Sequence, residues 1–133
     1  RRRERMECQE CSAATVSFAV PAEYSPYLPG EESAVALCSR CLAVQPATEP
    51  AADPDFERVS DSFPSGDAAV PLALLLGLLE NLALYRSEIT ELLGAVERAG
   101  TDPLLALDRL AADPDIETDL DLSGRRRQLE QLL

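Results

Sequence analysis

Four cysteines in this chain are arranged as two Cys-x-x-Cys pairs. Cys8 and Cys11 form the first pair, Cys38 and Cys41 form the second, and 26 residues separate the pairs. Two residues between cysteines allow a tight turn to direct both thiolates at one ion, and two such turns supply the four ligands that structural zinc takes. The spacing therefore predicts a structural Zn²⁺ site with these four residues as its metal ligands.

Other uses of the four cysteines were weighed against zinc. Redox Cys-x-x-Cys motifs are expected near a βαβ pattern, which neither pair has. Iron in the same thiolate cage is the first alternative, and disulfides are the second. The chain also departs from the usual knuckle sequence, because Ser12 and Leu42 follow the two pairs where a glycine often stands.

The length and charge of the chain limit its class. Its 133 residues suit one domain, or a small metal module joined to a second core. Twelve arginines stand against 24 acidic residues, for a net charge of −12, with no lysine and no histidine. Three explanations of this acidity are an acidic tail, a basic binding partner and adaptation to concentrated salt. Because the acids are spread along the chain and carboxylates maintain solubility at high ionic strength, we favour a halophilic protein from a salt-in cytoplasm.

No targeting or membrane segment is predicted. The charged start leads into Met6-Glu7-Cys8 and not into an apolar core, and the longest apolar stretch, Ala68–Leu79, is shorter than the ~20 residues that span a bilayer. We expect a cytoplasmic, reduced protein without membrane contact, which favours zinc over disulfides. Met6 makes a natural initiator, so residues 1–5 are expected to be a disordered N-terminal extension.

The first folded unit is predicted over residues 6–46 as a zinc ribbon with a small antiparallel sheet. Strands are expected at Ala14–Val20, Ala34–Leu37 and Leu42–Val44, the last ended by Pro46. Knuckle, strand, loop, strand, knuckle, strand is the order of a ribbon. About 40 residues rarely bury enough apolar surface to fold alone, so the metal should supply much of the folding free energy.

Residues 47–66 read as an acidic linker with two aromatic anchors, Phe56 and Phe63. We expect these rings to attach the linker to the helical core rather than to bind a partner. Residues 67–133 are then predicted as a helical unit of three or four helices. Leucines surround its first helix, which must be buried on more than one side.

Helix boundaries in this unit follow from capping residues. A break is expected near residues 85–87, with Ser87 as the N-cap of a second helix that Gly100 ends. Asp102-Pro103 predicts the start of a third helix, and Asp113-Pro114 its end. A final helix should follow Ser123, with three leucines on one face: Leu129, Leu132 and Leu133.

Enzyme chemistry is not predicted. The chain has no histidine for proton transfer, no glycine-rich phosphate loop and no nucleophile elbow. Four thiolates on one zinc would leave no open coordination position for water.

Arginines at positions 1, 2, 3, 5 and 125–127 suggest nucleic acid. Residues 67–122, however, carry twelve acids and three arginines, so a duplex would meet a negative surface. We expect Arg125–Arg127 to pair instead with Asp115, Asp119 and Asp121, or with the helical core.

The cysteine pairs occur together with several further motifs, which are Asp53-Pro54-Asp55-Phe56, Phe63-Pro64, Leu76-Gly77-Leu78-Leu79, Asp102-Pro103-Leu104-Leu105-Ala106-Leu107-Asp108-Arg109-Leu110 and Arg125-Arg126-Arg127-Gln128-Leu129-Glu130-Gln131-Leu132-Leu133. This combination resembles an uncharacterised family of small haloarchaeal zinc-ribbon proteins with a C-terminal helical region. The resemblance covers nearly everything from Met6 onward and implies lineage and a zinc ribbon. It implies no substrate, and no functional residue beyond the cysteines.

The sequence as a whole predicts an α+β protein that acts as a non-enzymatic zinc-binding module for protein interaction. Its partner is expected to be another protein or a second copy, with a possible homodimer formed through the leucine-rich Val70–Leu84 helix. A nucleic-acid-binding zinc-ribbon regulator is the first alternative, and an iron-thiolate electron carrier is the second.

Overall fold

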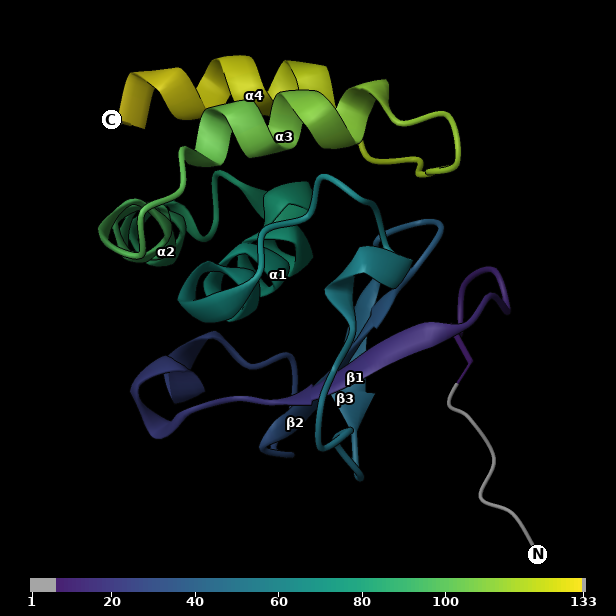
Figure 1. The fold of residues 1–133 in the computed structure, drawn as a ribbon. Helices are drawn as coiled ribbons and strands as arrows, with labels where there is room; N and C mark the ends of the chain where they lie inside the picture. Colours follow the sequence, from purple (N-terminus) through teal and green to yellow (C-terminus); the bar gives the residue numbers. More distant parts are fainter. Residues whose placement is uncertain (1–6, 133) are drawn as a thin grey trace, which may run out of the picture.

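The computed structural model describes residues 7–132 and has an α+β fold (Figure 1). Three strands come first, β1 (Thr15–Ala19), β2 (Ala34–Cys38) and β3 (Val44–Ala47). Four α-helices follow, α1 (Ala69–Leu78), α2 (Arg86–Arg98), α3 (Pro103–Ala112) and α4 (Leu122–Leu129). Short 3-10 helices lie between these elements, at η1 (Ala22–Tyr27), η2 (Phe56–Arg58), η3 (Gly66–Ala68), η4 (Leu79–Asn81) and η5 (Glu130–Leu132). The predicted residues 1–5 extension lies outside the described residues.

The strands form one antiparallel sheet in the order β1-β2-β3. Val16 pairs with Leu37 across the first ladder, and Val35 pairs with Pro46 across the second. All five residues of β2 are buried, as expected for a central strand. The small antiparallel sheet predicted from the sequence is therefore confirmed.

The prediction for the third strand is wrong in its bounds. The strand does not end before Pro46 but begins at Val44 and continues through Pro46 to Ala47. Because β3 lies at the edge of the sheet, the missing N–H of a proline need not interrupt a ladder on its outer side.

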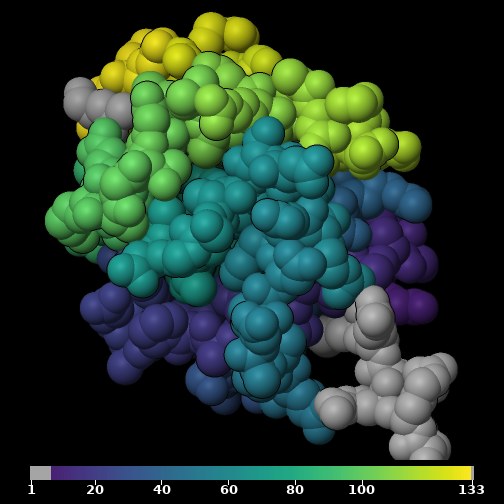
Figure 2. Space-filling model, viewed as in Figure 1, coloured from purple at the N-terminus to yellow at the C-terminus, as the bar shows by residue number. Residues whose placement is uncertain are grey.

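One apolar core joins the sheet to the helices. Figure 1 shows the sheet, the pair α1 and α2, and the pair α3 and α4 as successive layers, and the same segments form one continuous surface in Figure 2. Phe18 of β1 lies against Phe56, with ring centroids 5.2 Å apart, and Phe56 stacks on Phe63 at 5.3 Å. The two aromatic residues of the 47–66 segment therefore contact the sheet side of a core that also holds the helices.

The break between the first two helices differs from the predicted one. Helix α1 ends at Leu78, seven residues before the predicted break, and η4 and a turn follow it. Helix α2 begins at Arg86, and the cap position is held by Tyr85, whose carbonyl accepts the Ile89 N–H at 2.8 Å. Ser87 is therefore an internal residue of the helix and not its N-cap.

The leucines of α1 and η4 pack inward in several directions. This requires α1 to be short and α2 to turn back beside it, since one longer rod would leave some of these side chains in water. Of the leucines in the Val70–Leu84 segment, only Leu84 is largely exposed, at 72%. The other large side chains are buried or half-buried within one chain: Leu72, Leu74, Leu75, Leu76, Leu78, Leu79 and Leu82.

The start of α3 is as predicted, because Asp102 accepts hydrogen bonds from the N–H groups of Leu104 and Leu105 at 3.0 and 3.3 Å. Helix α4 begins at Leu122, with Asp121 as its N-cap, and not after Ser123. The Asp121 carboxylate accepts from Gly124 N–H at 3.0 Å. In the final leucine face, Leu129 is buried and Leu132 half-buried, while Leu133 lies outside the described residues. Within the described residues, no helix has the length and apolar character to cross a membrane.

Candidate metal centre

Each cysteine pair lies in a tight turn that leads into the sheet. In the first turn the Ser12 N–H donates to the Cys8 carbonyl at 2.9 Å, and the Cys8 N–H donates to the Ala13 carbonyl at 2.9 Å. In the second, the Cys38 N–H donates to the Ala43 carbonyl, also at 2.9 Å. The two turns have the same backbone pattern, so each presents a buried cysteine followed by a half-buried one.

Ser12 and Leu42 both have a φ of +67°, in the left-handed region that favours glycine. These are the two positions after the cysteine pairs where zinc-ribbon turns often have glycine. The structure keeps the turn geometry without glycine, at a backbone cost of about 1–2 kcal/mol per residue. Buried packing of the Leu42 side chain, which is 2% exposed, offsets part of that cost in the second turn.

The two turns bring the four sulfur atoms into one group. Cys8 Sγ lies 3.5 Å from Cys41 Sγ, and Cys11 Sγ lies 3.5 Å from Cys38 Sγ. All four sulfurs fall within 4.8 Å of one another, and none is in a disulfide. A tetrahedral ion with metal–sulfur distances of about 2.3 Å requires sulfurs about 3.8 Å apart. The arrangement therefore fits a metal ion held by Cys8, Cys11, Cys38 and Cys41.

Backbone N–H groups point at two of the sulfurs. Glu10 N–H donates to Cys8 Sγ at 3.3 Å, and the N–H groups of Arg40 and Cys41 donate to Cys38 Sγ at 3.3 Å. Hydrogen bonds of this kind favour the thiolate, which is the form that binds metal. The turns thus orient the sulfurs and also stabilise their charge.

The thiol pKa values reflect burial opposed by these hydrogen bonds. Burial raises the pKa of Cys8, but the backbone hydrogen bonds from Cys11 and Glu10, together with those from the Cys41 and Cys38 side chains, outweigh it, so the pKa lies below its ordinary value. The pKa values of Cys38 and Cys41 are raised, chiefly by burial. A cation at the centre would replace the protons of these thiols, so metal binding releases protons and strengthens as pH rises.

Polar contacts around the centre tie the first turn to the edge strand. The buried Gln45 of β3 accepts from Gln9 N–H at 3.0 Å and donates from Nε2 to the Glu7 carbonyl at 3.2 Å. Sequence reasoning missed Gln45, which directly follows the predicted strand at Leu42–Val44 and belongs to β3 in the structure. A partner outside the ligand set fixes how the ligand loop sits.

The second turn has its own polar contacts. Ser39 donates from its hydroxyl to the Ala14 carbonyl at 2.8 Å, which joins the second turn to the start of β1. The Arg40 carbonyl accepts from Glu117 N–H at 2.8 Å. The loop between α3 and α4 is therefore attached directly to the metal-ligand turn.

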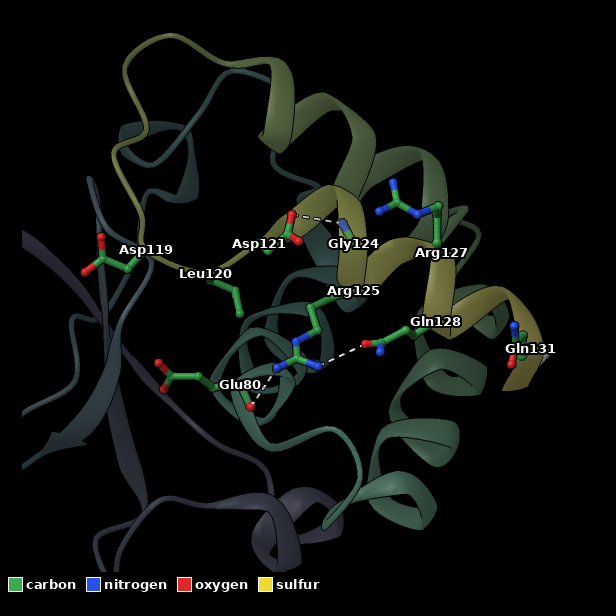
Figure 3. Close-up of a pocket in the computed structure, with 9 residues that line it drawn as sticks. All are labelled: Glu80, Asp119, Leu120, Asp121, Gly124, Arg125, Arg127, Gln128 and Gln131. Carbon is green, nitrogen blue, oxygen red and sulfur yellow. Dashed lines mark hydrogen bonds between the residues drawn. The ribbon is translucent and has the colours of Figure 1, made fainter.

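The C-terminal arginines lie apart from the cysteines, on α4. Figure 3 shows Arg125 reaching toward η4, where its guanidinium donates to the Glu80 carbonyl at 3.1 Å. Within α4, the same guanidinium donates to Gln128 Oε1 at 2.9 Å. Arg126 pairs with Asp108 at 3.0 Å and with Glu130. The prediction that this cluster pairs with the helical core holds for these two arginines. The aspartates named from the sequence are not their partners among the described residues.

Arg127 is exposed and has no hydrogen bond or ion pair with a described residue. Arg40 and Arg58 lie elsewhere in the sequence, near the second cysteine turn and in η2. Among the described residues the structure thus leaves α4 with one unpaired arginine rather than with a continuous basic surface.

The chain was compared with known families, curated proteins and solved structures. The model of a family of unknown function, DUF6276, matches residues 7–133. No curated protein matches the chain, and no solved structure does. The match includes all four cysteines and extends over both the sheet and the helices.

Proposed function

We propose, from the premise that this chain belongs to the DUF6276 family of unknown function, that the protein is a non-enzymatic zinc-ribbon module which presents a metal-stabilised surface to a protein partner. Zinc would be held by Cys8, Cys11, Cys38 and Cys41 and would stabilise the fold when bound. The bound zinc would hold the sheet and helices in one conformation, and the protein partner would bind that conformation.

The observation that carries this proposal is the convergence of the four sulfurs within 4.8 Å. A set of four thiolates fills a tetrahedral coordination sphere, which is the composition of structural zinc sites rather than catalytic ones. Zinc is favoured over iron because structural zinc sites commonly take four cysteines from two Cys-x-x-Cys pairs. An electron carrier, by contrast, would be identified by its colour and its redox couple.

Acidity supports a protein partner over nucleic acid. The net charge is −12, and two of the three arginines on α4 are already paired with the protein. A phosphate backbone would therefore meet carboxylates over most of the described surface. The same acidity supports a halophilic protein in a salt-in cytoplasm, because carboxylates keep a surface hydrated where salt screens charge.

A second protein is favoured over a second copy of this chain. The leucines of the Val70–Leu84 segment, which the sequence offered as a homodimer surface, pack within one chain except for Leu84. Two copies with a net charge of −12 each would also repel at moderate salt. Light scattering at molar and moderate salt should give the mass of a monomer.

Cobalt exchange tests the site within the whole chain. We expect Co²⁺ added to the metal-free protein to give one equivalent of a tetrahedral thiolate spectrum, which stoichiometric Zn²⁺ then abolishes. The Cys38→Ser variant should lose that spectrum, while Ser87→Ala, at an exposed position of α2, should keep it. Octahedral Co²⁺ bands, or a red purified protein with iron bands, would contradict the zinc assignment.

A further inference from the structure

A groove of about 680 Å³ lies away from the cysteines, between η1 and the helices α1 and α2. One wall is η1, with Tyr24 and Tyr27, and the other is formed by Val70 of α1 and Ala95 of α2. Its volume falls within the range of sites that hold a small ligand or a few side chains. Its lining includes both apolar and charged side chains, so a matching ligand would have an apolar part and a charged part.

The aromatic side of this groove is formed by two of the three tyrosines in the chain. Their ring centroids lie 6.3 Å apart with the planes tilted by 48°. Both rings are half-buried against the main core, so their inner parts are fixed while their outer parts face the groove. Tyr27 donates a hydrogen bond from its hydroxyl to Glu91 of α2, which holds η1 beside that helix.

Carboxylates dominate the charged side. Glu23, Asp67 and Glu91 line the groove, against Arg98 as its one lining arginine. Neither Glu23 nor Asp67 forms an ion pair with an arginine of the described chain. Burial, and then the hydrogen bond to Glu91, raise the pKa of Tyr27 to about 12, so its ring is neutral wherever the carboxylates are ionised.

Arg98 offsets only part of this negative charge. Its guanidinium lies back along α2, since a Cβ added to Gly94 would stand 3.1 Å from Arg98 Nη1. One arginine against three carboxylates leaves the lining with an excess of negative charge. A cationic ligand therefore suits this lining better than an anionic one.

We propose that this groove binds an arginine-bearing, extended segment of a protein partner, with the guanidinium over the tyrosine rings and paired with Asp67 and Glu91. A planar guanidinium stacks on aromatic faces and pairs with carboxylates through two parallel hydrogen bonds, whereas a lysine ammonium is a compact point charge. The inference rests on the proposed protein-interaction function and assigns the place and chemistry of that interaction. Phosphate ligands are disfavoured at the same site by its charge.

The test is a titration of the zinc-loaded, ¹⁵N-labelled full chain with the peptide acetyl-Ala-Pro-Arg-Pro-Arg-Pro-Ala-amide. Alternating proline keeps the probe extended and lowers its ordering cost. We expect saturable amide shifts confined to residues 22–27, 66–70 and 91–99, and weaker binding by the lysine version. Affinity should fall as NaCl rises from 0.15 M to 1 M, because the Debye length shortens from about 8 Å to about 3 Å.

Three variants make the test specific. Asp67→Asn with Glu91→Gln should weaken binding by about tenfold or more, since both charge-assisted hydrogen bonds to the guanidinium lose their charged acceptor. The matched control, Glu80→Gln with Asp119→Asn, removes the same charge from the cavity of Figure 3 and should bind as the unmodified chain does. Tyr24→Leu keeps apolar packing without the ring and should weaken binding by several-fold.

The outcomes separate this inference from the zinc proposal, because metal content is measured on the same samples. Shifts outside the groove, no saturable shifts, or equal binding by the two double variants would overturn the arginine site. In each of those cases a zinc-loaded chain would leave the ribbon assignment standing.

Discussion

Ser12 and Leu42 turn the two cysteine pairs toward one centre, at a φ that glycine adopts most easily. Ser12 is exposed and its hydroxyl makes no hydrogen bond with a described residue, so its side chain does not offset the backbone strain. We predict that Ser12→Gly raises the free energy of unfolding by about 0.5–1 kcal/mol, measured by urea unfolding of the zinc-loaded chain. Ser87→Gly, inside α2, should lower it by about 0.5 kcal/mol. A loss of stability in Ser12→Gly would contradict the strained-turn account.

Gln45 holds the first cysteine turn against β3 through two hydrogen bonds. We predict that Gln45→Leu keeps the sheet but weakens zinc affinity by about 10–100-fold, as measured by chelator competition, because outer contacts orient the ligand loop. Gln131→Leu, at an exposed position of η5, should leave the affinity unchanged. Equal zinc affinities of the two variants would show that Gln45 does not support zinc binding.

The grouping of the four sulfurs was predictable at this scale because Cys-x-x-Cys spacing restricts which sulfurs can lie close together. The left-handed turns without glycine and the role of Gln45 could not be predicted from the sequence. Each depends on contacts between residues more than 30 positions apart, or on packing that lets Leu42 adopt an unfavourable backbone conformation.

Helix α1 and strand β3 meet at Gly77, where an added Cβ would stand 3.0 Å from Val44 Cβ. We predict that Gly77→Ala lowers stability by about 1–3 kcal/mol through overpacking. Gly94→Ala in α2 would meet only the flexible end of Arg98 and should raise stability by up to about 1 kcal/mol from helix propensity. Thermal unfolding of both variants measures this, and a stabilised Gly77→Ala would mean that the helix does not press on the sheet.

Element types were predictable where local chemistry decides them. Asp102 followed by proline starts α3, because the carboxylate accepts two N–H groups that the helix leaves free. The end of α1 at Leu78 was not predicted, since the only breaker nearby is Gly77, and a single glycine within a helical pattern does not by itself end a helix. It follows from the need to bury leucines against both the sheet and α2, which only the assembled layers specify.

The core of the whole molecule is continuous from the sheet to α4, and the Arg40–Glu117 hydrogen bond joins the second cysteine turn to the α3–α4 loop. We predict that chelation of the metal lowers hydrogen-exchange protection in β2 and in α3 together, and that excess zinc restores both. Loss of protection in β2 with full retention in α3 would show that the helices fold independently of the metal.

The division into a ribbon at 6–46, a linker at 47–66 and a helical unit at 67–133 stays a prediction, because it concerns what folds alone. Composition could separate the segments, but it could not reveal that Phe18 of β1 forms one aromatic cluster with Phe56 and Phe63. Whole-molecule cohesion of this kind arises from packing between distant residues.

The central claim is that one zinc ion is held by the four cysteines, and elemental analysis of the purified full chain tests it most directly. We predict one zinc per chain, no stoichiometric iron, and loss of the zinc in a Cys8→Ser and Cys38→Ser double variant. A chain that folds with less than a tenth of an equivalent of any metal, or one that carries iron in place of zinc, would contradict the account.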